Sequence, residues 1–323
     1  RSVVAGWKPA PRLPPNGHAT EPSVLVNVEA VGICGSDLHY YRDGGIGSAT
    51  IDARDDWVPG HEFAGRVAAL SGGSMQDAAG QPLEEGDLVA VDPARPCMDC
   101  EFCRRGHTNL CPRVQFLGAP PVDGGMSERI VVPAESCWKV PSGNTAVEAM
   151  MLEPLGVAIH ALDLDQPHHA GETVCILGAG PIGQLVGQLM CLVTDDRDVC
   201  DVPPRTIIIF DPVTSRCQLA TDLLSSGRVA DVRAVSTDWC SGGGDAWGGA
   251  GEGGADVGCD RAGGESVVGG GFEDGPAAIA ALTNGRGCDL VIEATNSPDG
   301  LSHAAGCAAI GGRVVVIGIP DGN

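Results

Sequence analysis

The stretch VCILGAGPIGQLVGQLM, residues 174–190, constrains the fold more than any other part of this 323-residue chain. An apolar run ends at Gly178, and the pattern Gly178-x-Gly180-x-x-Gly183 then opens a segment with helical apolar spacing. In a dinucleotide-binding turn the first glycine permits the tight turn, the second lets the backbone approach a pyrophosphate, and the third lets helix and strand pack closely. A tight turn without a ligand is the alternative. The strand before and the helix after favour a cofactor-binding turn, which includes Pro181.

The segments that follow predict a doubly wound parallel sheet. Apolar runs at 206–210, 288–294 and 312–319 are continuous, as strands buried on both faces require, and helical segments separate them. The first half differs: residues 24–31 alternate between apolar and polar, and short strand candidates recur at 65–70, 87–93, 128–135 and 137–141. Such a pattern indicates a barrel or a sandwich. Residues 144–164 have a helical pattern, so we place the boundary near residue 165, between a domain at 1–165 and one at 166–323.

A low-complexity segment at 241–275, rich in glycine and acidic residues, interrupts the second half. It carries too little apolar surface to offset the entropy of ordering. We expect a mobile surface insertion and no binding site there.

Asp211 ends the second apolar run of the second half, 28 residues after Gly183 (211 − 183). The usual spacing is nearer about 20, and the polar stretch at 194–204 accounts for the excess as a loop insertion. A carboxylate there accepts hydrogen bonds from ribose hydroxyls and repels a 2′-phosphate, so NAD is favoured over NADP. Arg216 weakens this preference, since an arginine can receive that phosphate.

Four cysteines lie between residues 97 and 111 with the spacing C-x2-C-x2-C-x7-C. The chain has fourteen cysteines, no stretch of about 18 apolar residues and no apolar signal region at its start, so we expect a reducing, cytoplasmic environment and no membrane. In such an environment four thiolates can coordinate one zinc ion as a tetrahedron. Such a site is structural, because no coordination position stays open for water or substrate. Four unligated cysteines in a turn are the alternative.

The net charge of −22 disfavours nucleic acid as a partner.

A second group of metal-ligand residue types consists of Cys34, His61, Glu62 and Glu153. Three of them could hold zinc while one coordination position stays open, as a catalytic ion requires. They are too far apart in sequence for spacing alone to establish this. A histidine satisfied within a turn and a buried cysteine remain the default interpretation of the individual residues.

The order of these motifs resembles the zinc-dependent medium-chain dehydrogenase/reductase family, which includes the alcohol dehydrogenases. GICGSDLHYY, GHEFAG, the four-cysteine loop, EPLGVAIHA and GAGPIG follow one another as in that family, and the resemblance covers residues 20–320. CGSDLHYYRDGGIG and FLGAPPVDGGMSERIVVPAESCWKVP are most similar to the polyol branch, the sorbitol and xylitol dehydrogenases. The resemblance implies a GroES-like β-barrel catalytic domain followed by a Rossmann domain. The family continues beyond the last residues of this chain, so the chain is expected to be C-terminally truncated relative to it.

The resemblance also implies metal and proton-transfer roles. The expected ligands of the catalytic zinc are Cys34, His61 and Glu62, with Glu153 at the metal directly or through water. Ser36 and His39 match positions that move the alcohol proton towards solvent. The expected ligands of the structural zinc are Cys97, Cys100, Cys103 and Cys111.

Further roles concern the substrate and the cofactor. Tyr40 and Phe116 match positions that line a polyol pocket. The expected NAD contacts are Ile182, Asp211 and Arg216, together with Ile317, Gly318 and Ile319 where the sheet meets the nicotinamide.

The expected activity is NAD-linked oxidation of a polyol secondary hydroxyl to a ketose, by a dimer or tetramer. L-threonine 3-dehydrogenase, a secondary-alcohol dehydrogenase and a truncated, non-catalytic zinc protein are alternatives.

Overall fold

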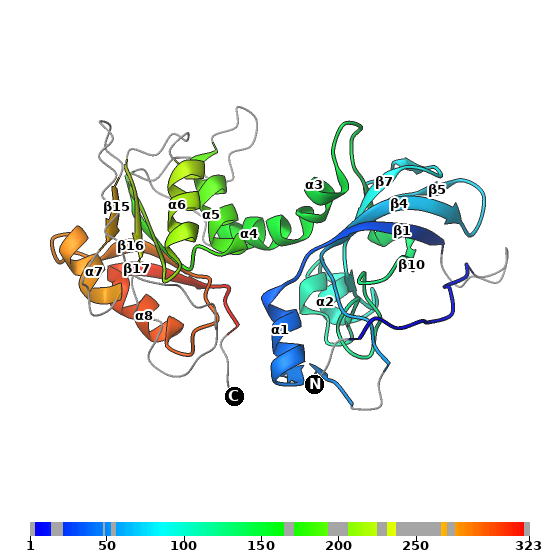
Figure 1. Cartoon of the computed structure of the whole chain (residues 1–323), viewed down its shortest axis with the longest axis horizontal. Coiled ribbons are helices and arrows are strands. Elements are labelled where there is room, and N and C mark those ends of the chain that lie inside the picture. The colour runs from blue at the N-terminus through cyan, green and yellow to red at the C-terminus, as the bar shows by residue number, and fades with distance from the viewer. Residues whose placement is uncertain are drawn as a thin grey trace. The chain divides into compact units, whose positions relative to one another are not determined.

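The computed structural model describes residues 4–13, 22–47, 49–52, 56–164, 171–192, 206–224, 231–236, 266–269 and 275–319. The chain divides into two compact units, Arg1–Glu153 and Pro154–Asn323 (Figure 1). The division falls at the start of helix α4 (Leu152–Leu164), earlier than the expected boundary near residue 165. Ala158 and Leu162 of this helix are fully buried in the core of the second unit, which explains the difference.

The first unit is built on an antiparallel sheet of five strands in the order β10-β1-β4-β7-β11. Their bounds are β1 (Ser23–Val31), β4 (Phe63–Leu70), β7 (Leu88–Val91), β10 (Arg129–Pro133) and β11 (Cys137–Lys139). All five coincide with the strands expected from the sequence. Alternate side chains, such as those of Val24 and Val26, enter one apolar core, because successive residues of a strand point to opposite faces.

Short elements surround this sheet. Three two-stranded ribbons pair β2 (Gly45–Ile46) with β3 (Ala49–Thr50), β5 (Met75–Gln76) with β6 (Pro82–Leu83), and β8 (Ala94–Arg95) with β9 (Gln115–Phe116). The helices are α1 (Gly35–Arg42), α2 (Glu101–Arg104) and α3 (Ala146–Met150), with 3₁₀ turns at Thr108–Leu110 and Ala134–Ser136.

The second unit is a six-stranded parallel sheet in the order β15-β14-β13-β12-β16-β17. The strands are β12 (Thr173–Leu177), β13 (Thr206–Asp211), β14 (Asp231–Ser236), β15 (Ser266–Gly269), β16 (Cys288–Glu293) and β17 (Ala308–Val316). The helices are α4, α5 (Pro181–Cys191), α6 (Thr214–Leu224), α7 (Gly275–Leu282) and α8 (Gly300–Cys307).

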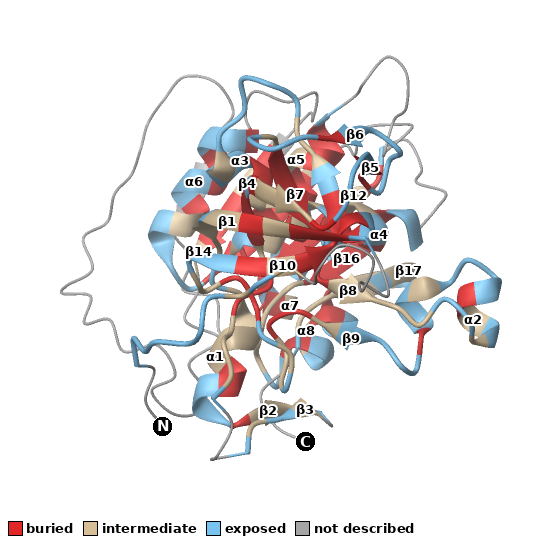
Figure 2. Cartoon of the chain, turned by 90° about the vertical axis from the view of Figure 1, so that its right-hand side faces the viewer, coloured by how far each residue is buried: buried red, intermediate tan, exposed pale blue. Residues whose placement is uncertain are grey.

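Helices cover both faces of this sheet. One face packs Ile176 and Ile209 against α4, α5 and α6, and the other packs Leu177 and Phe210 against α7 and α8. Figure 2 shows the buried residues concentrated along the strands of both sheets. Burial on both faces is why β12, β13 and β16 read as continuous apolar runs. Strand β17 lies at the edge of the sheet and is partly exposed, so the expectation of burial on both faces was wrong for this run. The expected two-domain α/β fold class is confirmed.

The low-complexity segment at 241–275 needs a correction. Residues 266–269 form strand β15, which pairs in parallel with Arg233–Ser236 of β14 at the edge of the sheet, and Gly275 begins α7. The reason is local: SVVG contains two β-branched valines, and its backbone adds to a sheet edge despite its glycine-rich surroundings. Residues 241–265 and 270–274 lie outside the described residues. Strand β14 was not anticipated from the sequence.

In the part of the chain that the structure describes, no helix combines the length and the apolar character that a membrane span requires. The cytoplasmic location and the dimeric or tetrameric assembly stay predictions.

Candidate functional site

Two paired strands bring Cys34, His61 and Glu62 together. Strands β1 and β4 are antiparallel, and Val31, the last residue of β1, pairs with Phe63, the first residue of β4. Cys34 follows the end of β1 at the start of α1, and His61 and Glu62 immediately precede β4. One ligand atom from each of the three residues lies within 4.8 Å of the others. A thiolate, an imidazole and a carboxylate at this separation fit a single zinc ion.

The surroundings of this group are acidic and partly buried. Burial raises the pKa of the Cys34 thiol to about 11, although hydrogen bonds with Ser36 oppose the rise. Burial also raises the pKa of Glu62. The pKa of Glu153 is raised to about 7, first by burial and then by the charges of Glu62, Asp92 and Asp37. Among the described residues, Glu153 does not belong to the ligand group itself, but it adds negative potential that favours a cation there.

We expect zinc to bind this group more tightly as the pH rises. With a pKa of about 11, the Cys34 thiol is protonated at neutral pH, so the arriving ion must displace its proton. Glu153 becomes ionised as the pH rises through about 7. Above that pH the affinity for zinc should rise about tenfold per pH unit, because each bound zinc ion displaces one proton from Cys34. A chelator-competition titration of protein with its four-cysteine loop already loaded measures this slope. A flat dependence would contradict it.

Two residues that the sequence analysis missed support the group. A Cβ atom on Gly32 would lie 2.2 Å from Oε2 of Glu62, so the carboxylate occupies the space that a side chain at position 32 would need. Asp37 accepts a hydrogen bond from the backbone N–H of Cys34 at 2.9 Å, and its other oxygen lies 3.9 Å from Nδ1 of His61. Metal-binding histidines are commonly oriented by such a carboxylate. The acidic residue three positions after Cys34, at the start of a helix, was the available signal.

The expected substrate and proton-transfer residues lie at different distances from the group. The rings of Phe116 and His61 are 5.5 Å apart, which places Phe116 beside the ligands. Tyr40 is buried, and its ring packs edge-on against Trp57 at 5.3 Å. On helix α1, Ser36 hydrogen-bonds Cys34 and His39 follows one turn later. Their roles stay predictions.

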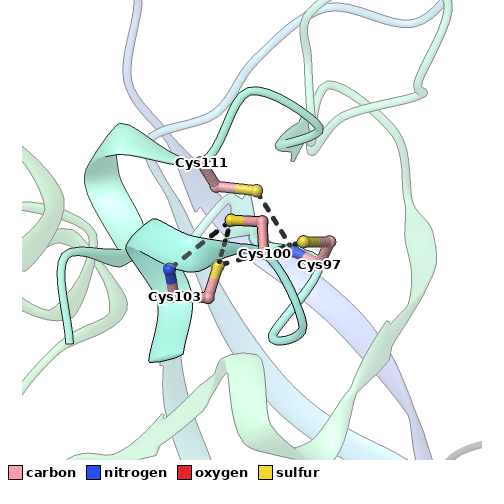
Figure 3. Close-up of side chains that lie close together, drawn as sticks. All are labelled: Cys97, Cys100, Cys103 and Cys111. Carbon is pink, nitrogen blue, oxygen red and sulfur yellow. Dashed lines mark hydrogen bonds between the residues drawn. The ribbon is translucent and has the colours of Figure 1, made fainter. Parts of the chain in front are cut away.

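The four cysteines of the 97–111 loop converge around one point (Figure 3). Their ligand atoms all lie within 4.8 Å of one another, and each is a free thiol. The Sγ atoms of Cys100 and Cys103 are 3.4 Å apart, and those of Cys97 and Cys103 are 4.0 Å apart. Zinc–sulfur bonds of about 2.3 Å in a tetrahedron require sulfurs separated by about 3.8 Å. The loop therefore fits a structural zinc ion.

Arg113 braces this loop and was also missed. Its Nη2 donates a hydrogen bond to Sγ of Cys97 at 3.2 Å and another to the carboxylate of Asp99. A guanidinium beside a thiolate offsets part of the negative charge that four cysteines bring to one metal ion.

In the second unit, the glycine turn has the geometry of a phosphate-binding loop. Gly178 follows β12 with φ at +99°, and Gly180 is the N-cap of α5, whose first residue is Pro181. A Cβ atom on Gly183 would lie 1.8 Å from the carbonyl oxygen of Gly178, so the third glycine is required for the helix to pack this closely. The N-terminus of α5 offers the positive potential that a pyrophosphate needs.

Asp211 lies directly beside this turn. It ends β13, which pairs in parallel with β12, and its Oδ2 accepts a hydrogen bond from the N–H of Ala179 at 2.9 Å. Its Oδ1 accepts from Val213 at 2.8 Å, and Nη1 of Arg216 lies 3.5 Å from Oδ2. The structure thus brings together the carboxylate and the glycines that the sequence placed 28 residues apart.

The remaining expected cofactor residues occupy two places in this unit. Ile182 on α5 and Ile317 after β17 are partly buried and pack against the core. A Cβ atom on Gly318 would lie 1.9 Å from the carbonyl oxygen of Thr295, and Ile319 is exposed. Residues 317–319 follow β17 and therefore lie at the carboxyl end of the sheet.

Comparison with known proteins finds relatives that cover both units of the chain. Residues 20–142 match the family described as Alcohol dehydrogenase GroES-like domain. The sorbitol dehydrogenase of Bacillus subtilis is 32% identical over 302 residues, which cover 93% of this chain and 69% of that enzyme. The chain belongs to the zinc-dependent medium-chain dehydrogenase/reductase family.

Two other similar proteins show how the likeness is distributed. D-xylulose reductase A of Aspergillus niger is 40% identical over 162 residues, 50% of this chain and 43% of that enzyme. The chain thus spans less than half of the length of this relative. The crystal structure of a protein described as a short chain alcohol dehydrogenase from Escherichia coli CFT073, complexed with NADH, matches with a TM-score of 0.64 and 27% identity. The match covers 96% of this chain and 71% of that chain.

Proposed function

We propose that this dehydrogenase oxidises a secondary hydroxyl of a polyol to a ketone, with zinc at Cys34, His61 and Glu62 and with NAD as the hydride acceptor. The observation that carries the proposal is the convergence of these three ligands within 4.8 Å, in a chain that also holds a dinucleotide-binding turn. The names of the sorbitol and D-xylulose relatives support a polyol as the substrate class.

Zinc bound here supplies a Lewis acid that makes a substrate hydroxyl acidic near neutral pH. The ligand set of one thiolate and one carboxylate, with Glu153 close by, is harder than a set with two thiolates. A hard, acidic site suits a substrate with several hydroxyl groups. Phe116, packed on the ring of His61, forms an apolar wall beside the metal ligands.

Helix α1 offers a route for the proton that leaves the substrate. Ser36 lies against Cys34, and His39 is one helical turn away. The Nδ1 of His39 lies 3.1 Å from Oδ2 of Asp43, whose side chain is 55% exposed. We infer that Ser36 and His39 move the proton towards solvent and that Asp43 receives it at the surface.

NAD is the expected dinucleotide because Asp211 puts a buried carboxylate beside the glycine turn. A ribose with two free hydroxyls fits against it, while a 2′-phosphate would meet its negative charge.

The test is a substrate panel with each cofactor. We expect zinc-loaded protein to reduce NAD with sorbitol or xylitol at least about tenfold faster than NADP. A tenfold ratio corresponds to about 1.4 kcal/mol, and the contact of two like charges costs several kcal/mol. Threonine and 2-butanol are the matched alternatives. Turnover of either one without turnover of polyols would reassign the substrate. Stoichiometric zinc and NADH binding without any turnover would indicate a binding protein instead.

A further inference from the structure

Glu293 is a buried carboxylate that the proposed reaction does not use. It ends strand β16 and is 3% exposed. Its Oε1 accepts a hydrogen bond from the backbone N–H of Thr295 at 2.8 Å and a second from the hydroxyl of the same residue. Its carbonyl oxygen accepts from the N–H groups of Ile317 at 2.8 Å and Gly318 at 3.1 Å. One residue therefore ties the end of β16 to the turn that follows it and to the end of β17.

The carboxylate fills space that two glycines leave free. A Cβ atom on Gly300, the first residue of α8, would lie 2.6 Å from Oε1 of Glu293. A Cβ atom on Gly318 would lie 2.5 Å from Oε2. The hydroxyl of Thr295 also accepts a hydrogen bond from the N–H of Ser297 at 3.2 Å. The carboxylate thus packs against both glycines, while its hydrogen bonds hold the turn after β16 and those of its carbonyl hold the end of β17.

This network stands where a dinucleotide must lie. The strand order reverses between β12 and β16, and ligands of doubly wound sheets bind at that point, outside the carboxyl ends of the strands. Asp211 marks the adenosine side on β13, so the other half of the dinucleotide extends over the ends of β16 and β17. A Cβ atom on Gly178 would lie 3.2 Å from Cγ2 of Thr295, so the Thr295 turn lies beside the glycine turn.

We propose that Glu293 is a positioning residue that holds the part of the site receiving the nicotinamide. It acts through Thr295 and Gly318, without contact to the cofactor. The proposal rests on the proposed function in one respect, the binding of NAD.

Paired affinities for NADH and ADP-ribose test this role, because ADP-ribose lacks only the nicotinamide. We expect Glu293→Ala to weaken NADH binding about tenfold, as the loss of buried hydrogen bonds predicts, and ADP-ribose binding less than about twofold. Glu293→Gln keeps an acceptor oxygen for Thr295 and should restore most of the NADH affinity. Thr295→Val removes the donated hydroxyl at constant size and supplies the same readout if Glu293→Ala does not fold.

Glu172 provides a matched control in the same sheet. It is also buried, but it lies at the amino end of β12, where it pairs with Arg313 at 2.9 Å. Glu172→Gln should lower the melting temperature and leave the ratio of the two affinities unchanged. If Glu293→Ala lowers the affinities for NADH and ADP-ribose equally, or lowers neither, the positioning role is wrong while the proposed function stands. Failure of the unaltered protein to bind NADH would overturn the proposed function with it.

Discussion

The variant Cys34→Ser is expected to lose at least about a thousandfold in kcat/KM for polyol oxidation, equivalent to about 4 kcal/mol of transition-state stabilisation. A serine hydroxyl stays protonated and is a poor zinc ligand, so only His61 and Glu62 would remain of the group. Because Cys34 is only half-buried, the substitution should change the free energy of unfolding of the metal-free protein by less than about 1 kcal/mol. Steady-state kinetics and metal analysis check both statements.

A second cysteine of the same unit is the control for this experiment. Cys137 is fully buried in the core of the first unit, and the structure places it in neither metal-ligand group. Cys137→Ser should destabilise the fold while zinc content stays unchanged. Cys34→Ser should instead lose one zinc ion per chain and keep its affinity for NADH. Full zinc content with normal turnover in Cys34→Ser would refute the assignment of the metal site.

Gly183→Ala is expected to weaken NADH binding about a hundredfold and to destabilise the second unit by about 2–3 kcal/mol. The added methyl group would lie 1.8 Å from the carbonyl oxygen of Gly178, and a backbone atom cannot give way as the tip of a side chain can. Helix α5 must shift, and its N-terminus moves away from the pyrophosphate position. Fluorescence titration with NADH and thermal unfolding measure the two effects.

Gly156 on α4 offers the matched substitution. A Cβ atom there would meet nothing within 4 Å, and the residue lies exposed in a helix. Gly156→Ala should therefore be neutral or stabilising by about 0.5–1 kcal/mol. Zinc content should stay constant in both variants. Normal NADH affinity in Gly183→Ala would show that the turn does not hold the cofactor.

The sequence predicted the glycine turn and the four-cysteine loop, because each is formed by residues close together in the chain. The glycine turn follows from a strand, three glycines and a helix within one stretch, and the four-cysteine loop follows from spacing within fifteen residues. Cys34 and His61 were different. Their convergence depends on the pairing of Val31 with Phe63, which no local pattern reveals, and only the family resemblance suggested it.

The residues that were missed act through contacts that only the folded chain makes. Gly32 matters because the carboxylate of Glu62 fills the space where a Cβ atom would lie, and Arg113 matters because a folded loop places it on Cys97. Glu293 reads as one more residue of an apolar strand until its partners are known. Strand β15 was missed because composition describes a whole segment, while four residues suffice to add to a sheet edge.

Because Val31 pairs with Phe63, zinc binding depends on the correct register of β1 and β4. The side chains of a strand alternate between faces, so a slip of one residue between β1 and β4 would turn the core side chains of either strand outward. The same slip would carry the thiol and the imidazole past each other. Chains that refold with these strands in the wrong register would therefore bind less zinc, even where their strand content is unchanged.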